Sequence, residues 1–277
     1  MIVEPAPAKI NLALHVRRRR PDGYHELETL FVFAADGDSV TVVPDATDRF
    51  AITGPFAAAL AGAAEADNLV IRAAHAFRAA FDIAQPHAIT LDKHLPIASG
   101  IGGGSADAAA TLRALAGLHG IAPDDPRLFV IAEALGADVP ACLLGRATLG
   151  TGKGEALLPV EGLAGMPLLL VNPGVAVSTA AVFARWDGED RGGIAADGDL
   201  LARALVGRND LQAPAVAIAP AIAAVLALLD AAAGVRLARM SGSGATCFAL
   251  FESVAARDAA AARAAAEGWW TLATTLT

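Results

Sequence analysis

Apolar and polar residues alternate near the start of the chain. Every second residue from Ile10 to Val16 is apolar, and this period of two predicts a β-strand with one buried face. The polar residues that would share its other face are Lys9, Asn11 and His15. Two further strands are expected at 27–33 and 39–43, separated by the turn residues 36–38. The N-terminal part should therefore begin as an antiparallel sheet.

The middle of the chain shows helical periodicity. Residues 69–81 form a run of helical character that follows Asp67 and Asn68, either of which suits the N-cap of a helix. Two more helices are expected at 112–118 and 126–135, and the glycine after the second would end it. A helix-rich middle is thus predicted to follow the first strands.

Strands are expected again at 88–91, 168–171 and 247–251. Residues 213–229 carry no charge but contain Pro214 and Pro220, so they predict a loop and a buried helix from near Pro220. A membrane-spanning helix would need about 20 strongly apolar residues.

Composition offers no clean linker between domains. We expect two domains, 1–154 and 155–277, with the boundary near Gly154. The chain has 277 residues, of which 55% are hydrophobic, which is enough for a substantial core.

Charge and cysteine content limit the partners. The net charge of −8 argues against nucleic acid, so an anionic substrate must be held locally. Cys142 and Cys247 fit no metal-binding spacing and predict reduced thiols in a cytoplasmic protein. The first nine residues lack the basic and apolar regions of a signal peptide, so neither export nor a membrane partner is expected.

A glycine-rich loop carries the clearest chemistry. It runs directly into an alanine-rich helix, so backbone N–H groups and the positive end of the helix dipole would converge on an anion. The alternative is a flexible turn in which Ser105 caps the helix and Asp107 complements its dipole. The loop consists of Pro96, Ile97, Ala98, Ser99, Gly100, Ile101, Gly102, Gly103, Gly104, Ser105 and Ala106.

Two familiar nucleotide-binding loops do not fit. The Gly-x-x-x-x-Gly-Lys-Ser/Thr pattern does not occur, and residues 150–154 lack its spacing. A dinucleotide loop would need glycine at position 105, where the chain has serine.

Three other features have both a structural and a functional interpretation. The second glycine cluster, Met240–Thr246, suits a tight turn before a strand. Asp138 lies in the string Leu135–Pro140, two residues before a proline, and suits a helix N-cap. The structural interpretation of Lys9 is an exposed lysine on a strand.

Together these pieces resemble the three motifs of the GHMP small-molecule kinases, in order and in spacing, along nearly the whole chain. Four further strings resemble the family of 4-diphosphocytidyl-2-C-methyl-D-erythritol kinases. They are Pro7-Ala8-Lys9-Ile10-Asn11-Leu12, Asp22-Gly23-Tyr24-His25, Leu135-Gly136-Ala137-Asp138-Val139-Pro140 and Asn172-Pro173-Gly174.

The resemblance implies an α+β, two-domain GHMP-kinase fold. Its N-terminal domain would be α/β and ribosomal protein S5-like, its C-terminal domain would be α+β with an antiparallel sheet, and the active site would lie in the cleft between them. It also implies transfer of the γ-phosphoryl group of ATP, accompanied by Mg²⁺, to the 2-hydroxyl of a cytidine diphosphate-linked polyol in non-mevalonate isoprenoid synthesis. A monomer or weak homodimer is expected.

The resemblance also assigns residues. Lys9 and Asp138 match the catalytic pair, and the loop Pro96–Ala106 matches the ATP-phosphate loop, with Ser105 close to phosphate or metal. Asn68 and Lys93 fall where the family lines its adenine pocket, although a helix cap and a surface lysine are equally good interpretations of them. The protein ligands of Mg²⁺ remain unassigned.

The acceptor half of the predicted site follows from the same comparison. Tyr24 and His25 would bind cytosine, by stacking and by hydrogen bonding, and Phe183 would close the opposite face. A core tyrosine is the alternative for Tyr24. Asn11 and Thr179 match substrate-contacting positions.

The basic run Arg17–Arg20 is expected to be a solvated turn rather than a diphosphate site. Two other functions stay open at this stage. One is a GHMP kinase for homoserine, a mevalonate derivative or a sugar, and the other is a nucleotide-binding protein without catalysis.

Overall fold

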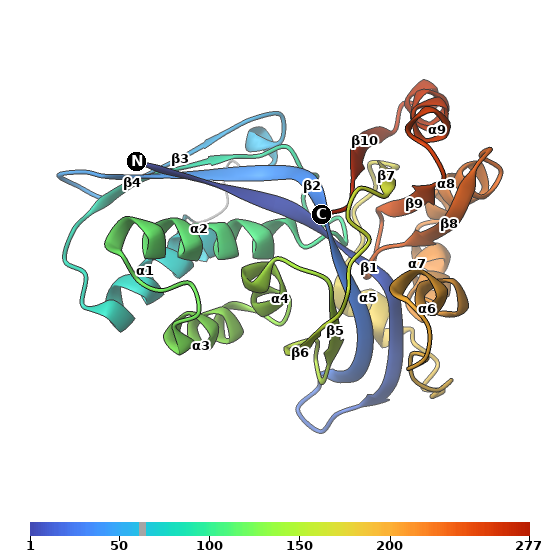
Figure 1. Cartoon of the computed structure of the whole chain (residues 1–277), viewed down its shortest axis with the longest axis horizontal. Coiled ribbons are helices and arrows are strands. Elements are labelled where there is room, and N and C mark those ends of the chain that lie inside the picture. The colour runs from blue at the N-terminus through green and yellow to red at the C-terminus, as the bar shows by residue number, and fades with distance from the viewer. Residues whose placement is uncertain (61–64) are drawn as a thin grey trace. The chain divides into compact units, whose positions relative to one another are not determined.

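Two long strands open the chain. β1 spans Ile2–Arg19 and β2 spans His25–Pro44 in the computed structural model, which describes residues 1–60 and 65–277 (Figure 1). β2 runs through residues 36–38 without a break, so the turn expected there is wrong. A side chain at Gly37 would come within 2.7 Å of the Pro7 Cα, which explains the glycine inside a strand.

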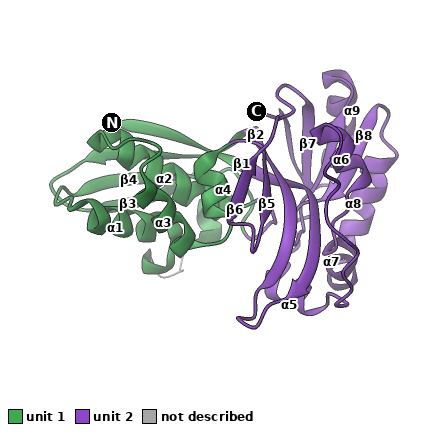
Figure 2. Ribbon diagram, turned by 60° about the horizontal axis from the view of Figure 1, so that its bottom comes forward, with its two compact units in different colours: residues 1–8, 36–97, 102–145 green, residues 9–35, 98–101, 146–277 purple. Residues whose placement is uncertain are grey.

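The chain separates into two compact units, coloured in Figure 2. Unit 1 comprises residues 1–8, 36–97 and 102–145, and unit 2 comprises residues 9–35, 98–101 and 146–277. β1 and β2 each contribute one part to either unit. The continuous domains 1–154 and 155–277 stay a prediction.

Unit 1 combines a small sheet with a group of helices. β3 (Arg49–Thr53) pairs in parallel with β4 (His87–Asp92), which pairs antiparallel with the second half of β2. The helices are α1 (Leu69–Phe81), α2 (Gly103–His119), α3 (Pro126–Leu135) and α4 (Val139–Leu144), with short 3-10 turns at Ala57–Leu60 and Glu65–Asp67. The predicted helices 69–81 and 126–135 are confirmed. Strand 88–91 and helix 112–118 lie within β4 and α2.

Helix α2 is the central helix of unit 1 and packs against α1, α3 and α4. Its alanines give it a narrow surface, and most residues between Ala106 and Ala116 are buried. Its N-cap is Gly102, in the left-handed conformation with φ 64°. Ser105 therefore lies inside the first turn, and its expected alternative role as the capping residue is wrong.

Unit 2 is built on a four-stranded antiparallel sheet in the order β10 (Trp270–Thr275), β7 (Pro167–Asn172), β9 (Cys247–Phe251) and β8 (Val235–Met240). The strands expected at 168–171 and 247–251 are confirmed. β5 (Thr148–Thr151) pairs with the first half of β2 and with β6 (Ala156–Pro159). The fold is thus α+β, with antiparallel pairing predominant.

Five helices complete unit 2: α5 (Thr179–Ala184), α6 (Leu200–Val206), α7 (Gln212–Ile218), α8 (Ala221–Asp230) and α9 (Val254–Ala266). α8 and α9 contact the sheet and bury an apolar core between helix and strand. The buried helix expected from near Pro220 is α8. The loop expected before it is wrong, because alanines favour helix and form α7 there.

Both cysteines are buried thiols, in α4 and β9. Burial raises the pKa of the Cys247 thiol, which disfavours the reactive thiolate. No helix in the described part of the chain combines the length and the apolar character needed to span a bilayer.

Candidate active site

Lys9 and Asn11 lie on β1 in unit 2, and both are 2% exposed. Lys9 Nζ donates to Asn11 Oδ1 over 2.9 Å and lies 5.2 Å from the centre of the Phe31 ring. Asn11 Nδ2 in turn donates to Thr29 Oγ1 over 2.8 Å. The exposed polar face that the alternation predicted is wrong, because this strand is buried on both faces. A buried lysine and amide held in one network are typical of functional residues rather than of a solvated strand.

The glycine-rich loop divides between the units, and its unit 2 part, residues 98–101, contacts the turn Ser241–Thr246. Ser241 Oγ donates to the Gly100 carbonyl over 3.0 Å, and Thr246 N donates to the Ser99 carbonyl over 3.0 Å. Gly100 has φ 80°, and a Cβ there would lie 2.5 Å from the Ser241 carbonyl oxygen. Only glycine allows this approach. The second glycine cluster is thus a turn before a strand, as expected, and also the partner of the first.

The turn also contacts two predicted substrate residues. Asn11 N donates to Ser241 Oγ over 3.2 Å. Thr179, the first residue of α5, shares a 2.8 Å hydrogen bond between its Oγ1 and Ser243 Oγ. Unit 2 therefore brings together Lys9, Asn11, Thr179 and residues 98–101.

In unit 1 the rest of the loop, Pro96–Ile97 and Gly102–Ala106, leads into α2. The first turn of α2 contains no acidic side chain. No carboxylate of that turn therefore competes with a bound anion for the N–H groups at the start of the helix. Neither of the alternative roles given to this loop, a cap at Ser105 or a dipole-complementing Asp107, describes the start of the helix. Asp107 is buried in an ion cluster instead.

That cluster consists of Lys93, Asp38 and Asp107, all 2–3% exposed. Lys93 Nζ donates to Asp38 Oδ2 and, over 2.7 Å, to Asp107 Oδ2. Burial alone would lower the pKa of Lys93, but the two aspartates outweigh it and raise that pKa. Burial raises the pKa of the Asp107 carboxyl to about 7. The interpretation of Lys93 as a surface lysine is therefore wrong.

The cluster anchors the start of α2. A Cβ on Gly103 would lie 3.1 Å from Lys93 Nζ, so the ammonium lies directly beside the first helical turn. Asp38 Oδ1 accepts hydrogen bonds from the backbone N–H groups of His94 and Leu95, over 2.5 and 2.8 Å. Sequence reasoning missed Asp38 because residues 36–38 are typical of a turn.

Asn68 and Asp138 both occupy N-cap positions in unit 1. Asn68 Oδ1 accepts a 2.9 Å hydrogen bond from Val70 N, so the helix-cap interpretation of Asn68 is confirmed, and its adenine role stays a prediction. Asp138 precedes α4 and is half-buried, but within the described residues of α4 its side chain makes no capping hydrogen bond. Capping therefore does not account for Asp138.

The predicted cytosine residues lie in unit 2. The His25 ring stacks on Phe183 with 4.8 Å between centroids, and Trp186 meets His25 edge-on at 5.6 Å. Tyr24 is 56% exposed, so the core-tyrosine interpretation is wrong. Lys153 Nζ lies 4.8 Å from the centre of the Tyr24 ring. Burial, and then Arg19, lower the pKa of His25, which keeps its ring neutral at pH 7.

Sequence reasoning did not identify Lys153 or Trp186. The signal for Lys153 was its place in the glycine-rich run 150–154, which matched no known loop. In the run Arg17–Arg20, Arg17 Nε pairs with Asp190 over 2.8 Å, and Arg18 and Arg20 pair with Glu26 over 3.5 and 3.7 Å. Surface carboxylates thus engage these arginines, and Arg17–Arg19 form the end of strand β1, so the turn expected for them is wrong.

Comparisons with known proteins show the family of the chain. The family model of the GHMP kinases N terminal domain matches residues 68–146, and that of the GHMP kinases C terminal matches residues 193–268. A protein of Rhizorhabdus wittichii named 4-diphosphocytidyl-2-C-methyl-D-erythritol kinase is 57% identical, over 97% of this chain and 92% of its own. One of the same name from Methylorubrum extorquens is 51% identical, over 96% of this chain and 95% of its own.

Solved structures show the same relationship. A crystal structure of 4-(cytidine 5'-diphospho)-2C-methyl-D-erythritol kinase matches with a TM-score of 0.83 and 35% identity, over 99% of both chains. Homoserine kinase from Cytophaga hutchinsonii has a TM-score of 0.70 and 18% identity, covering 99% of this chain and 93% of its own, and so shows the shared fold. The chain belongs to the GHMP kinases, which are small-molecule kinases, and within them to the family named 4-diphosphocytidyl-2-C-methyl-D-erythritol kinase.

Proposed function

We propose that this kinase transfers the γ-phosphoryl group of ATP to the 2-hydroxyl of 4-diphosphocytidyl-2-C-methyl-D-erythritol, giving the 2-phosphate and ADP in non-mevalonate isoprenoid synthesis. The observation that carries the proposal is identity of 57% to a relative of that name along nearly the whole chain. The stacked His25 and Phe183 support it, because they offer an aromatic surface and a neutral hydrogen-bonding ring for a base.

The donor phosphates would bind the loop Pro96–Ala106. The N–H groups at the start of α2 and the positive helix end favour negative charge there. Mg²⁺ usually reaches kinase sites bound to nucleotide phosphates and keeps several waters. Among the described residues, no group of three His, Cys, Asp or Glu side chains lies close enough together to hold a metal ion, and the protein ligands of Mg²⁺ stay unassigned.

Lys9 and Asp138 are the proposed catalytic residues. Asp138 would orient the acceptor hydroxyl and take its proton late, because a loose transition state depends more on positioning and charge stabilisation than on early proton removal. Lys9 would offset negative charge on the transferred group. Asn11, which holds Lys9 Nζ, and Thr179 would contact the polyol, and Tyr24 would stack on cytosine. A cytoplasmic location and a monomer or weak homodimer stay predictions.

A coupled ADP-release assay with ATP and this acceptor tests the proposal. Asp138→Asn should lower kcat by about 10²–10⁴-fold, since it removes the proton acceptor, while nucleotide affinity stays near that of the wild type. Asp125→Asn is the matched control, because Asp125 is also a half-buried N-cap aspartate, at the start of α3 in the same unit. Near-normal turnover by Asp138→Asn would remove Asp138 from catalysis.

The same assay separates the alternatives. Turnover of homoserine, mevalonate or a sugar in preference to the cytidine substrate would assign a different GHMP kinase. ATP binding without ADP release on any acceptor would indicate a nucleotide-binding protein without catalysis.

A further inference from the structure

The side chain of Asn209 is hydrogen-bonded to the start of the turn that contacts the glycine-rich loop. It lies between α6 and α7 in unit 2 and is 8% exposed. Its Nδ2 donates to the carbonyl oxygens of Met240 and Gly242, each over 2.8 Å, and its Oδ1 accepts from Leu211 N over 2.9 Å. Both amide N–H groups and the amide oxygen are therefore used, and the two donors fix opposite ends of the sequence 240–242.

The residues on either side of Asn209 hold strand β1. Leu14 N donates to the Arg208 carbonyl over 2.8 Å, and Asp210 N donates to the Leu14 carbonyl over 2.9 Å. Val16 N donates to Asp210 Oδ2 over 2.8 Å. Arg208 Nε donates to the other oxygen, Asp210 Oδ1, over 2.7 Å, which fixes the carboxylate. Residues 208–210, here called the 208–210 clamp, thus bind a strand and a turn at once.

Both of those segments carry parts of the proposed site. β1 carries Lys9 and Asn11, and the turn bonds to Gly100 and Thr179 through Ser241 and Ser243. The clamp therefore sets where the strand lies relative to the turn, although none of its residues was singled out by the sequence.

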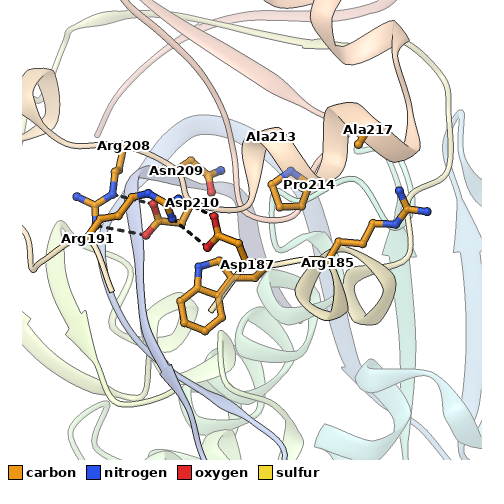
Figure 3. Close-up of a pocket in the computed structure, with 10 residues that line it drawn as sticks. Arg185, Asp187, Arg191, Arg208, Asn209, Asp210, Ala213, Pro214 and Ala217 are labelled. Atoms are coloured by element: carbon orange, nitrogen blue, oxygen red, sulfur yellow. Dashed lines mark hydrogen bonds and ion pairs between the residues drawn. The ribbon is translucent and has the colours of Figure 1, made fainter. Parts of the chain in front are cut away.

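Arg208, Asn209 and Asp210 also help to line the pocket drawn in Figure 3, which has a volume of about 660 Å³. The charges that line it are largely matched, since Arg191 pairs with Asp187 over 2.5 Å and Arg208 with Asp210 over 2.7 Å. Asn209 itself is buried, and so are Met240 and Gly242, whose carbonyl oxygens it holds. Removing the amide would therefore take a hydrogen-bond donor from each of two buried carbonyl groups, which costs free energy.

We propose that Asn209 is a positioning residue for phosphoryl transfer. Its amide fixes the turn Ser241–Thr246 against β1 and touches neither substrate. The inference rests on the proposed function. Removing the amide should let the turn drift, and misplacement by about 1 Å can cost on the order of 100-fold in rate. Because the substrate-contacting side chains remain, KM should change much less than kcat.

The test compares Asn209→Ala with wild type in two measurements. We expect kcat to fall by about 10–100-fold with both KM values within about threefold. We also expect faster backbone hydrogen exchange in residues 240–246 of the substrate-free enzyme. Asn209→Asp is the second variant, because it keeps the volume and the acceptor for Leu211 N but has no N–H for the two carbonyls. It should lose at least as much activity.

Asp199→Ala is the matched control. Asp199 caps α6 in the same unit, where its side chain accepts from Ala202 N over 2.7 Å. This variant should lower the urea midpoint while kcat and exchange in 240–246 stay as in wild type. Unchanged exchange in both Asn209 variants, or an equal fall in kcat for Asp199→Ala, would overturn the inference. If wild type itself fails to turn over, the proposed function fails, and the exchange comparison still decides whether Asn209 holds the turn.

Discussion

The ion cluster under the start of α2 makes a quantitative prediction for Lys93→Met. The side chains of Lys93, Asp38 and Asp107 are 3%, 0% and 4% exposed. At an effective dielectric constant of about 20, opposite charges 2.7 Å apart attract by roughly 6 kcal/mol. Removing the ammonium also removes its own desolvation cost, so the expected loss in free energy of unfolding is smaller, about 3–5 kcal/mol.

Most of that loss should arise at Asp107. Asp38 keeps its hydrogen bonds from His94 N and Leu95 N after the substitution. Asp107 Oδ1 has no hydrogen-bond partner among the described residues, so its carboxylate would be left buried without compensation. An added Asp107→Asn substitution should therefore recover part of the lost stability, because a neutral amide costs less to bury.

The pH dependence has a definite sign. Burial raises the pKa of Asp107 to about 7 in the folded chain, against about 3.9 when unfolded, although Lys93 opposes the shift. Without Lys93 the pKa rises further, and the folded state binds a proton that the unfolded state has released. The stability of Lys93→Met should then fall as pH rises through neutrality, so the loss is larger at pH 8 than at pH 6.

Urea unfolding of both variants at the two pH values is the assay. Lys153→Met is the matched control, because Lys153 lies over the half-exposed Tyr24 ring and should cost less than about 1 kcal/mol. The reasoning is refuted if Lys93→Met stays within about 1 kcal/mol of wild type at pH 8. It also fails if the double variant is no more stable than the single one.

Two further predictions concern other parts of the chain. Tyr24→Ala should raise KM for the cytidine substrate about tenfold or more, because the variant loses the ring that would stack on cytosine. KM for ATP and the urea midpoint should stay unchanged, because the ring is exposed. Equal effects on both KM values would contradict this prediction. His87 Nε2 and His119 Nε2 lie 2.9 Å apart, and burial lowers the pKa of both rings below 6.5. The folded chain therefore binds fewer protons than the unfolded chain between pH 7 and pH 5, and the wild type should lose stability as the pH falls through this range. Since His119 helps to lower the pKa of His87, His119→Gln should reduce that acid loss in urea unfolding, and an unchanged loss would argue against the pair.

Local pattern determined the elements and the family of this protein. The helices 69–81 and 126–135 follow from periodicity and capping residues within their own sequence. The strands 168–171 and 247–251 follow from short apolar runs. The Lys9 strand, the glycine-rich loop and the second glycine cluster resemble the three motifs of the GHMP kinases, and the comparisons with known proteins confirmed that family.

Tertiary structure decided what surrounds those elements. An alternating strand looks half-exposed in sequence, yet Lys9 and Asn11 are buried, because chain far from β1 covers its second face. Asp38 resembled a turn residue and Lys93 a surface lysine, and only their meeting with Asp107 makes a buried cluster. Asn209 carries no local signal, since its two carbonyl partners lie 31 and 33 residues away in sequence. Periodicity records how each segment meets solvent or core, but it does not encode which distant segment forms that core, and this choice depends on the packing of the whole chain.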